Sequence, residues 1–321
     1  MLRLNATHRR WPLSRPFRIS RGVKTAADAV ILEASDGRAA GYGEAIPYPR
    51  YGETVEGVLE QIRALGDVRG RRQLLSLLPP GAARNAIDCA LWDLEAKAGR
   101  APPESIATAP LPIAFTVGLD APEVMAEAAR PLAGFKWVKV KVDAADPETQ
   151  ILAVRRALPD AELIVDPNES WSFDVLRRLQ GLLASARVSL VEQPLPASED
   201  EALEGFQSTV PLCADESCHV AEDLPRLRAR YQAVNIKLDK TGGLTAAFDL
   251  YAAARAHGFG VMVGCMICSS LSIAPAMALA RRADFVDLDG PLWLAEDWPN
   301  GVRLDGGLLL PPAPELWGSR G

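Results

Sequence analysis

Residues 134–143 read "GFKWVKVKVD", and this stretch decides how the middle of the chain is interpreted. From Trp137 onward apolar residues alternate with lysines, which predicts a β-strand with Lys139 and Lys141 side by side on one face. On an exposed sheet such a pair is ordinary, because water solvates both ammonium groups. Inside a closed barrel the same pair requires negative charge nearby. The rest of the chain decides between these two environments.

Short apolar runs of the same kind recur along the rest of the chain and alternate with amphipathic segments such as 146–158 and 242–258. A regular alternation of strand and helix predicts right-handed crossovers and a parallel sheet. Eight such strands are typical of a closed barrel of the TIM type. The expected strands are 112–118, 137–142, 162–168, 188–194, 211–217, 232–238, 260–265 and 284–290.

The N-terminal part of the chain has a different pattern. Residues 27–47 read as two strands joined at an Asp-Gly turn, and 81–103 read as a helix followed by a break at "GRAPP". The apolar residues of that helix recur at helical spacing, which indicates core rather than site. We therefore expect an N-terminal α+β domain over residues 1–105, a barrel over 106–291, and a tail over 292–321 that packs back on the first domain.

Charged residues interrupt the apolar runs at the carboxyl ends of the expected strands. They are Lys141, Asp166, Glu192, Asp215 and Lys237 on five successive strands, followed by Asp287 and Asp289 on the last strand. Any one of them has a structural explanation, such as a turn residue or a helix cap. Five in register favour one functional site, because TIM barrels carry their chemistry at this rim.

Three carboxylates on adjacent strands, those of Asp166, Glu192 and Asp215, would repel one another unless a cation joined them. Oxygen ligands without a histidine cluster favour a hard ion, with Mg²⁺ as the first choice and Mn²⁺ as the second. The five cysteines, an odd number, indicate reduced thiols. The "CMIC" sequence at 265–268 is interpreted as packing rather than as redox or zinc chemistry.

The lysines add positive charge to this site, and together with Mg²⁺ they call for an anionic substrate. An enediolate, formed by removing the proton next to a carboxylate, is a second negative charge that such a site would stabilise. Lys141 and Lys237 lie on opposite sides of the expected barrel, which suits an epimerase, and Lys139 is expected to polarise the bound carboxylate. Nearby positive charge and partial burial are expected to lower a lysine pKa toward neutrality, as a general base requires.

The composition excludes several classes of partner. The chain has 321 residues, of which 48% are hydrophobic and 24% charged, and its net charge is -6. No dense basic run is interleaved with aromatics, so we expect a small-molecule partner and no nucleic acid. No apolar stretch approaches the roughly 20 residues of a spanning helix, and the start does not resemble a secretory signal, so we expect no membrane partner and a cytoplasmic location. The oligomeric state stays open, and a homo-oligomer is compatible with the sequence.

A set of motifs along the chain resembles the enolase superfamily, specifically its muconate-lactonizing subgroup. The motifs are "GYGEAIP", "ALWDL", "KVK", "VDPNESW", "EQPLP", "ADESCH" and "NIKLDKTGG", in this order. The resemblance implies an α/β fold, a TIM-like (β/α)7β barrel with an N-terminal α+β capping domain. It also implies Asp166, Glu192 and Asp215 as magnesium ligands, with Lys141 and Lys237 as the acid/base pair.

Within that subgroup, "DLDGP" at 287–291 resembles the DxD element of the dipeptide epimerases, whose acids hold the α-ammonium group of the substrate. Asp287 and Asp289 are therefore expected to select a cationic amine. Arg21 stands where these enzymes carry an arginine for the glutamate side chain, and Thr116 is expected to hydrogen-bond the substrate carboxylate. The resemblance implies a dipeptide substrate and the conversion of L-Ala-D-Glu to L-Ala-L-Glu in murein peptide recycling.

Other functions stay open at this stage. A dipeptide epimerase of other specificity would use the same rim with a different capping pocket. A cycloisomerase or o-succinylbenzoate synthase of the same superfamily would need a pocket without amine ligands. A metal-dependent hydrolase is disfavoured, because such barrels generally need a water-activating histidine or a bridged metal pair. A non-enzymatic scaffold is disfavoured because the full set of lysines and carboxylates is present.

Overall fold

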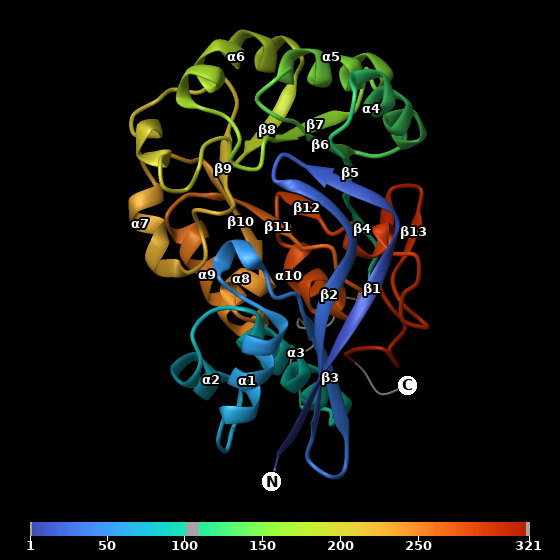
Figure 1. The fold of residues 1–321 in the computed structure, drawn as a ribbon. Coiled ribbons are helices and arrows are strands. Elements are labelled where there is room, and N and C mark those ends of the chain that lie inside the picture. Colours follow the sequence, from blue (N-terminus) through green and yellow to red (C-terminus); the bar gives the residue numbers. More distant parts are fainter. Residues whose placement is uncertain (1, 101–108, 319–321) are drawn as a thin grey trace.

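The computed structural model describes residues 2–100 and 109–318. It comprises an N-terminal antiparallel sheet with helices, an eight-stranded parallel barrel and a short C-terminal hairpin (Figure 1). The predicted class, a TIM-like barrel with an N-terminal α+β domain, is confirmed. The boundary predicted at residue 105 and most of "GRAPP" lie outside the described residues.

The N-terminal sheet has the strand order β1-β2-β3, with β1 (Arg3–Ile19), β2 (Gly22–Ser35) and β3 (Ala40–Ala45) all antiparallel. Strands β2 and β3 meet at the predicted turn, where Asp36 Oδ1 accepts the N–H groups of Arg38 and Ala39. The sequence analysis found these two strands but missed β1. Most side chains of β1 are exposed or half-buried, so the strand lacks the apolar face that reveals a strand in a sequence.

After the sheet come η1 (Pro49–Tyr51), α1 (Val55–Ala64), α2 (Arg71–Leu77) and α3 (Ala82–Lys97). Helix α3 packs directly on β3, since a Cβ on Gly43 would lie only 2.2 Å from the Ala86 carbonyl oxygen. The helix is buried along almost its whole length, so its predicted core role is confirmed. Asn85 on α3 donates to Asp239 Oδ1 at 2.9 Å, which ties the N-terminal domain to the barrel.

The barrel sheet contains every strand predicted for this region. Its strands run parallel, and the last strand lies next to the first. They are β5 (Ala114–Val117), β6 (Trp137–Lys141), β7 (Glu162–Asp166), β8 (Val188–Glu192), β9 (Leu212–Ala214), β10 (Ala233–Lys237), β11 (Gly260–Gly264) and β12 (Phe285–Asp287). The first predicted strand is divided, because Pro112 belongs to a separate strand, β4 (Leu111–Pro112).

Helical segments surround the barrel (Figure 1). They are α4 (Pro122–Ala129), η3 (Arg130–Leu132), α5 (Pro147–Ala157), α6 (Phe173–Ser185), η4 (Asp200–Leu203), η5 (Ala221–Asp223), α7 (Leu224–Leu227), α8 (Leu238–Thr241), α9 (Leu244–Ala256), α10 (Ser270–Ala280) and η6 (Gly290–Trp293). Side-chain caps fix several starts; for example, the Ser172 hydroxyl oxygen accepts the Val175 N–H before α6. Within the described ranges, no helix has the length and apolar character needed to cross a membrane.

The inward-facing side chains of the barrel form two layers. One buried cluster is apolar and consists of Ala114, Trp137, Ile164, Leu190, Cys213, Ala233 and Met262. Because side chains alternate along a strand, the next inward positions toward the carboxyl ends are Lys139 and Lys141 on β6 and Asp166 on β7. The apolar layer therefore forms the floor on which the charged residues stand.

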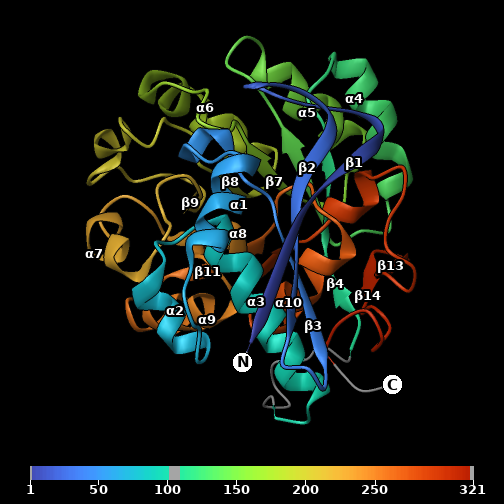
Figure 2. The same cartoon turned by 60° about the horizontal axis from the view of Figure 1, so that its bottom comes forward.

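The turn between β1 and β2 reaches over the carboxyl ends of the barrel strands (Figure 1, Figure 2). The Ser20 hydroxyl donates to the Pro167 carbonyl at 2.9 Å, and the Leu119 N–H donates to the Arg18 carbonyl at 3.0 Å. This contact places side chains of the N-terminal domain above the charged layer.

The C-terminal segment contains β13 (Arg303–Asp305) and β14 (Leu308–Leu310), and β14 pairs with β4. Beyond this hairpin, Trp317 Nε1 donates to the Cys89 carbonyl at 3.3 Å and the Gly318 N–H donates to Asp93 Oδ1 at 2.7 Å. The tail thus contacts both the barrel and helix α3.

Candidate active site

A ring of charged side chains lies at the carboxyl ends of the barrel strands. Lys141, Asp166, Glu192, Lys237 and Asp287 are the last residues of β6, β7, β8, β10 and β12, and Asp215 directly follows β9. Each is at most 8% exposed. The structure therefore brings the charged residues predicted from the strand ends into one buried site.

Lys139 lies at the centre of the carboxylates. Its Nζ is 2.7 Å from Glu192 Oε2, 2.7 Å from Asp287 Oδ2 and 3.0 Å from Asp166 Oδ2. Burial alone would lower the pKa of this ammonium group, but the three carboxylates outweigh burial and raise it well above its ordinary value. The negative charge that the paired lysines require is thus supplied within the barrel itself.

The two other lysines each face one carboxylate. Lys141 Nζ lies 2.6 Å from Asp166 Oδ2, and Lys237 Nζ lies 2.7 Å from Asp215 Oδ2. Burial would lower the pKa of Lys237, but Asp215 and Glu192 raise it above its ordinary value. The predicted fall of a lysine pKa toward neutrality is therefore wrong for Lys237 in this arrangement, because its nearest charged neighbour is a carboxylate rather than another cation.

The three adjacent carboxylates differ in how well they are compensated. Burial would raise the pKa of Asp166, but Lys141 and Lys139 hold it below its usual range. Lys237 and Lys240 act in the same way on Asp215, whose pKa lies well below its usual range. Burial and the charge of Asp166 raise the pKa of Glu192. Glu192 is thus the carboxylate for which additional positive charge is most stabilising.

Oxygen atoms around this ring lack hydrogen-bond partners. Glu192 Oε2 lies close to Lys139 Nζ but outside hydrogen-bonding geometry, and it is buried with no hydrogen bond from the described residues. Three other buried oxygens also accept no hydrogen bond from the described residues: Asn168 Oδ1, Asn235 Oδ1 and Asp287 Oδ1. Among the described residues, no three acidic, histidine or cysteine side chains form a ready-made metal site, since lysines lie between the carboxylates. The buried oxygens without hydrogen bonds and the all-oxygen donor set nevertheless fit a hard divalent cation.

A second layer of polar residues holds these carboxylates in place. Asn235 Nδ2 donates to Glu192 Oε1 at 2.9 Å, and Gln193 Oε1 accepts the Asp215 N–H at 2.9 Å. Lys240 Nζ donates to Asp215 Oδ1 at 2.7 Å. The sequence analysis assigned no role to Asn235, Gln193 or Lys240. Polar residues inside the motifs "EQPLP" and "NIKLDKTGG" were the signal that could have found them.

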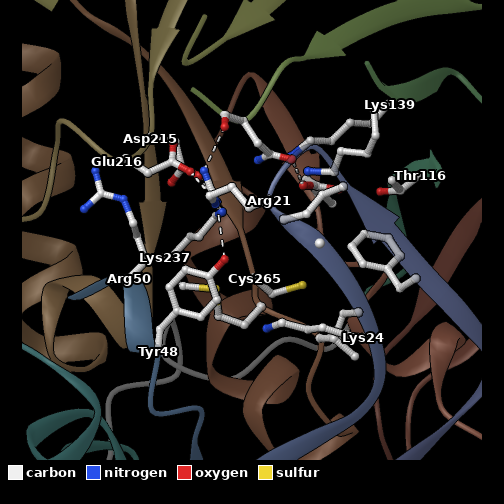
Figure 3. Close-up of a pocket in the computed structure, with 18 of the residues that line it drawn as sticks. Arg21, Lys24, Tyr48, Arg50, Thr116, Lys139, Asp215, Glu216, Lys237 and Cys265 are labelled. Atoms are coloured by element: carbon white, nitrogen blue, oxygen red, sulfur yellow. Dashed lines mark hydrogen bonds and ion pairs between the residues drawn. The ribbon is translucent and has the colours of Figure 1, made fainter. Parts of the chain in front are cut away.

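A cavity of about 530 Å³ opens above the charged ring (Figure 3). The β1–β2 hairpin contributes Phe17, Ile19, Val23 and Lys24 to its wall, and the loop around η1 contributes Tyr48 to Tyr51. Arg50 fastens this loop to the barrel, because its guanidinium donates to both oxygens of Glu169 at 2.8 and 2.9 Å. The N-terminal domain thereby closes one side of the cavity.

Arg21 lines the cavity but is engaged by protein groups. Its guanidinium lies 2.8 Å from Glu216 Oε1 and 3.1 Å from Glu169 Oε2, and it donates to the Asn168 carbonyl at 2.9 Å. In Figure 3 the side chain points toward Glu216, while Lys24 lies apart from this cluster. Arg21 therefore holds the capping loop on the barrel.

Lys24 is the cation in the cavity wall that sequence reasoning missed. Its Nζ lies 4.6 Å from the centre of the Tyr48 ring and forms no ion pair with a described residue. Burial lowers the pKa of this ammonium group. The signal in the sequence was a second cation shortly after Arg21, in "SRGVK".

Asp287, Asp289 and Thr116 also line the cavity, and Figure 3 shows Thr116 on the other side from Tyr48 and Arg50 of the capping loop. Asp289 Oδ2 accepts the Thr116 N–H at 2.8 Å and Trp293 Nε1–H at 3.1 Å, so its position is fixed. Burial and the neighbouring Asp287 raise the pKa of Asp289 to about 6. Thr116 contributes its backbone amide to this network, and its side chain faces the cavity.

Several known proteins are similar to this chain. It is 47% identical to the L-Ala-D/L-Glu epimerase of Escherichia coli (strain K12), over 93% of this chain and 96% of that protein. It is 44% identical to an N-acetyl-D-glutamate racemase of Pseudoalteromonas sp, over 90% of this chain and 95% of that protein.

Solved structures agree with these relatives. An enolase family member from Agrobacterium tumefaciens, with homology to dipeptide epimerases and with bound sodium and L-Ala-L-Glu, has a TM-score of 0.96 and 47% identity. The match covers 99% of this chain and 100% of that chain. A dipeptide epimerase from Enterococcus faecalis, complexed with Mg and L-Leu-L-Tyr, has a TM-score of 0.89 and 28% identity, with 99% of each chain covered.

Models of two protein domains match the chain. The N-terminal domain of mandelate racemase/muconate lactonizing enzyme matches residues 1–105, and the enolase C-terminal domain-like family matches residues 123–314. The resemblance read from the motifs is confirmed, and the chain belongs to the enolase superfamily, in its mandelate racemase/muconate lactonizing enzyme group.

Proposed function

We propose that this protein is a dipeptide epimerase, an isomerase that inverts the α-carbon of the C-terminal residue and interconverts L-Ala-D-Glu and L-Ala-L-Glu. The observation that carries the proposal is the placement of Lys141 and Lys237 at the ends of β6 and β10, on opposite sides of one buried ring. The strong similarity to an L-Ala-D/L-Glu epimerase supports the same reaction.

In this reaction one lysine, in its neutral form, accepts the α-proton, and the ammonium group of the other lysine delivers a proton to the opposite face. Asp166, Glu192 and Asp215 would hold Mg²⁺, or Mn²⁺ as the second choice, and the ion would supply positive charge for the negative charge that develops on the substrate carboxylate. Lys139 adds a fixed positive charge at the centre of the ring. The buried apolar floor of the barrel closes the site from below.

The ends of the dipeptide are assigned to opposite walls of the cavity. Asp287 and Asp289 bind the α-ammonium group, because Asp287 Oδ1 is buried without a hydrogen-bond partner among the described residues and Asp289 is held in place by Thr116 and Trp293. Thr116 donates its hydroxyl to the substrate carboxylate. The side-chain carboxylate of glutamate faces the N-terminal domain.

We assign Lys24, rather than Arg21, as the principal partner of that carboxylate. Arg21 is already paired with Glu216 and Glu169, whereas Lys24 faces the cavity without an ion pair. A buried ammonium group gains most from an arriving anion when no protein carboxylate compensates it.

Lys24→Met is expected to lower kcat/KM for L-Ala-L-Glu by about 10- to 100-fold, the usual value of a hydrogen bond to a charged group. Activity toward L-Ala-L-Leu should change little, because methionine keeps the length and apolar stem of lysine. Steady-state rates on both dipeptides check this result. Lys136→Met, an exposed position, serves as the control. An equal loss on both substrates would remove Lys24 from the specificity pocket.

A second candidate function is racemisation of an N-acylated glutamate, which the N-acetyl-D-glutamate racemase relative favours. The proton transfer would be the same, and Lys24 would meet the same side-chain carboxylate. Such a substrate has no α-ammonium group, so the pair Asp287 and Asp289 would have no cation to bind.

Asp289→Asn separates the two candidates. Asparagine keeps an oxygen for the Thr116 and Trp293 donors but removes the negative charge. We expect kcat/KM for L-Ala-L-Glu to fall about 10- to 100-fold, since an ion pair in a buried site is lost. Turnover of N-acetyl-D-glutamate should stay within about threefold, because no ion pair is involved. Unchanged dipeptide activity would favour the racemase or a cycloisomerase.

The test of the proposed function is proton NMR in deuterated water with Mg²⁺ and a small set of L-Ala-X dipeptides and N-acetyl-glutamate. Loss of the α-proton signal with inversion on L-Ala-L-Glu or L-Ala-D-Glu supports the proposal. Exchange on apolar dipeptides alone would support the proton-transfer reaction but contradict the specificity for a glutamate side chain. We place the reaction in murein peptide recycling in a bacterial cytoplasm, and accumulation of L-Ala-D-Glu in a strain lacking the gene would support this place.

A further inference from the structure

Lys240 is a buried cation that the proposed proton transfer does not use. It lies in the short helix α8, directly after β10, and its side chain is 0% exposed. Its Nζ donates to Asp215 Oδ1 at 2.7 Å, to the Cys218 carbonyl at 2.9 Å and to the Asn235 carbonyl at 3.0 Å, and it also contacts the Asp215 carbonyl oxygen. An ammonium group has three N–H donors, so all of them are engaged.

The two oxygens of the Asp215 carboxylate therefore have unequal partners. Oδ1 is held by Lys240, and Oδ2 is held by Lys237 at 2.7 Å. Asp215 Oδ2 is the one hydrogen-bond partner of Lys237 among the described residues, which leaves Lys237 with donors to spare. Lys237 can leave the carboxylate without breaking other bonds, whereas Lys240 is fixed by three backbone carbonyl groups as well.

We propose that Lys240 is a positioning residue that fixes Asp215 by Oδ1 and leaves Oδ2 as the oxygen presented to the divalent ion and to Lys237. The proposal rests on the proposed function, in which Asp215 is a metal ligand. The Asp215 N–H, held by Gln193 at 2.9 Å, completes the restraint, so both the backbone and the carboxylate are immobilised. Partners behind a ligating carboxylate set its orientation and thereby the affinity for the ion.

The direction in which removal of Lys240 changes the affinity for the ion distinguishes a positioning role from a purely electrostatic one. A buried ammonium group next to a metal ligand repels the arriving cation, so removal of Lys240 would tighten ion binding if charge were its only contribution. If Lys240 orients Asp215, its removal weakens ion binding, because the carboxylate then rotates among several directions. The two roles predict opposite shifts of the same dissociation constant.

The experiment measures Mn²⁺ binding to the full chain by calorimetry, without dipeptide, for the parent protein and for Lys240→Met. Methionine keeps an unbranched chain and removes all donors. We expect the dissociation constant to rise about tenfold or more, the usual effect of losing a partner behind a metal ligand. Lys240→Gln keeps an N–H donor on a shorter side chain, so its dissociation constant for Mn²⁺ should lie between those of the parent protein and Lys240→Met. This variant tests the proposal if Lys240→Met fails to fold.

Arg84→Met is the matched control. Arg84 is also a buried cation, and it donates to the Thr241 and Gly242 carbonyls at the end of the same helix, but it has no contact with Asp215. Its replacement should lower thermal stability and leave Mn²⁺ affinity within twofold, on the order of the error expected for a remote site.

The Mn²⁺ affinities of the Lys240 and Arg84 variants together test the positioning role of Lys240. Weaker Mn²⁺ binding in the Lys240 variant with unchanged binding in the Arg84 variant supports the proposal. Equal or tighter binding in the Lys240 variant, or equal weakening in both, overturns it. If the parent protein bound no Mn²⁺ and exchanged no α-proton, the proposed function itself would fail, and Lys240 would lose this role with it.

Discussion

Replacement of Lys237 by alanine is expected to lower kcat for the interconversion of L-Ala-L-Glu and L-Ala-D-Glu by about 10²- to 10⁴-fold, the contribution of a positioned acid or base. Lys237 is buried at the end of β10, and its single hydrogen bond to Asp215 leaves donors for the substrate. Lys240 cannot take over, because its ammonium group is held by backbone carbonyls. Lys141→Ala should cause a similar loss on the other face.

The measurement combines steady-state rates with α-proton exchange in deuterated water. Each single variant keeps one of the two lysines, so it should still exchange the α-proton of one epimer without inverting it. Lys141→Ala and Lys237→Ala should retain exchange on opposite epimers. This complementary pattern distinguishes loss of a base from general damage, which would reduce exchange on both epimers.

Lys136→Ala is a suitable control, since this lysine precedes the same strand as Lys141 but is exposed. Its kcat should stay within about twofold of the parent value, as for most surface substitutions. Near-full activity of either Lys141→Ala or Lys237→Ala would show that the two-base scheme is wrong.

The barrel could be predicted from the sequence because each of its strands and helices is encoded in a short, continuous stretch of residues. Alternation along "WVKVKV" places both lysines on one face, and the strand–helix repeat brings the carboxyl ends of parallel strands to one rim. Lys141, Asp166, Glu192, Asp215 and Lys237 could therefore be assigned to one ring before their distances were known.

Contacts between distant segments could not be predicted in this way. The sequence analysis assigned Arg21 to the substrate carboxylate and missed Lys24, and only the contacts of Arg21 with Glu216 and Glu169 show that Arg21 is already paired. Strand β1 was missed because its residues are half-exposed on both faces. The predicted fall of a lysine pKa is wrong for Lys237, because the total charge of a site does not say which carboxylate an ammonium group contacts.

Removal of divalent ions with a chelator is expected to lower kcat for epimerisation by about 10³-fold or more, because an ion at this position supplies several kcal/mol of charge stabilisation. The buried Oε2 of Glu192 accepts no hydrogen bond from the described residues, and burial and Asp166 raise the pKa of this carboxyl group, so Glu192 is where additional positive charge stabilises the ring most. Addition of Mg²⁺ should restore the rate, and Mn²⁺ should do so as well. The measurement is the initial rate on L-Ala-L-Glu after dialysis against chelator and after titration with each ion.

Glu192→Gln tests whether this ring is the place of that ion. The substitution preserves an oxygen for the Asn235 donor and removes one negative charge, so Mg²⁺ should bind more weakly and higher Mg²⁺ should partly restore the rate. Glu162→Gln, at the exposed start of β7, should leave the Mg²⁺ dependence unchanged. Full activity of the chelated parent protein would contradict a metal role. Unchanged Mg²⁺ dependence in Glu192→Gln would instead move the ion away from this ring, because a cation held by the buried Glu192 carboxylate must bind more weakly once that negative charge is removed.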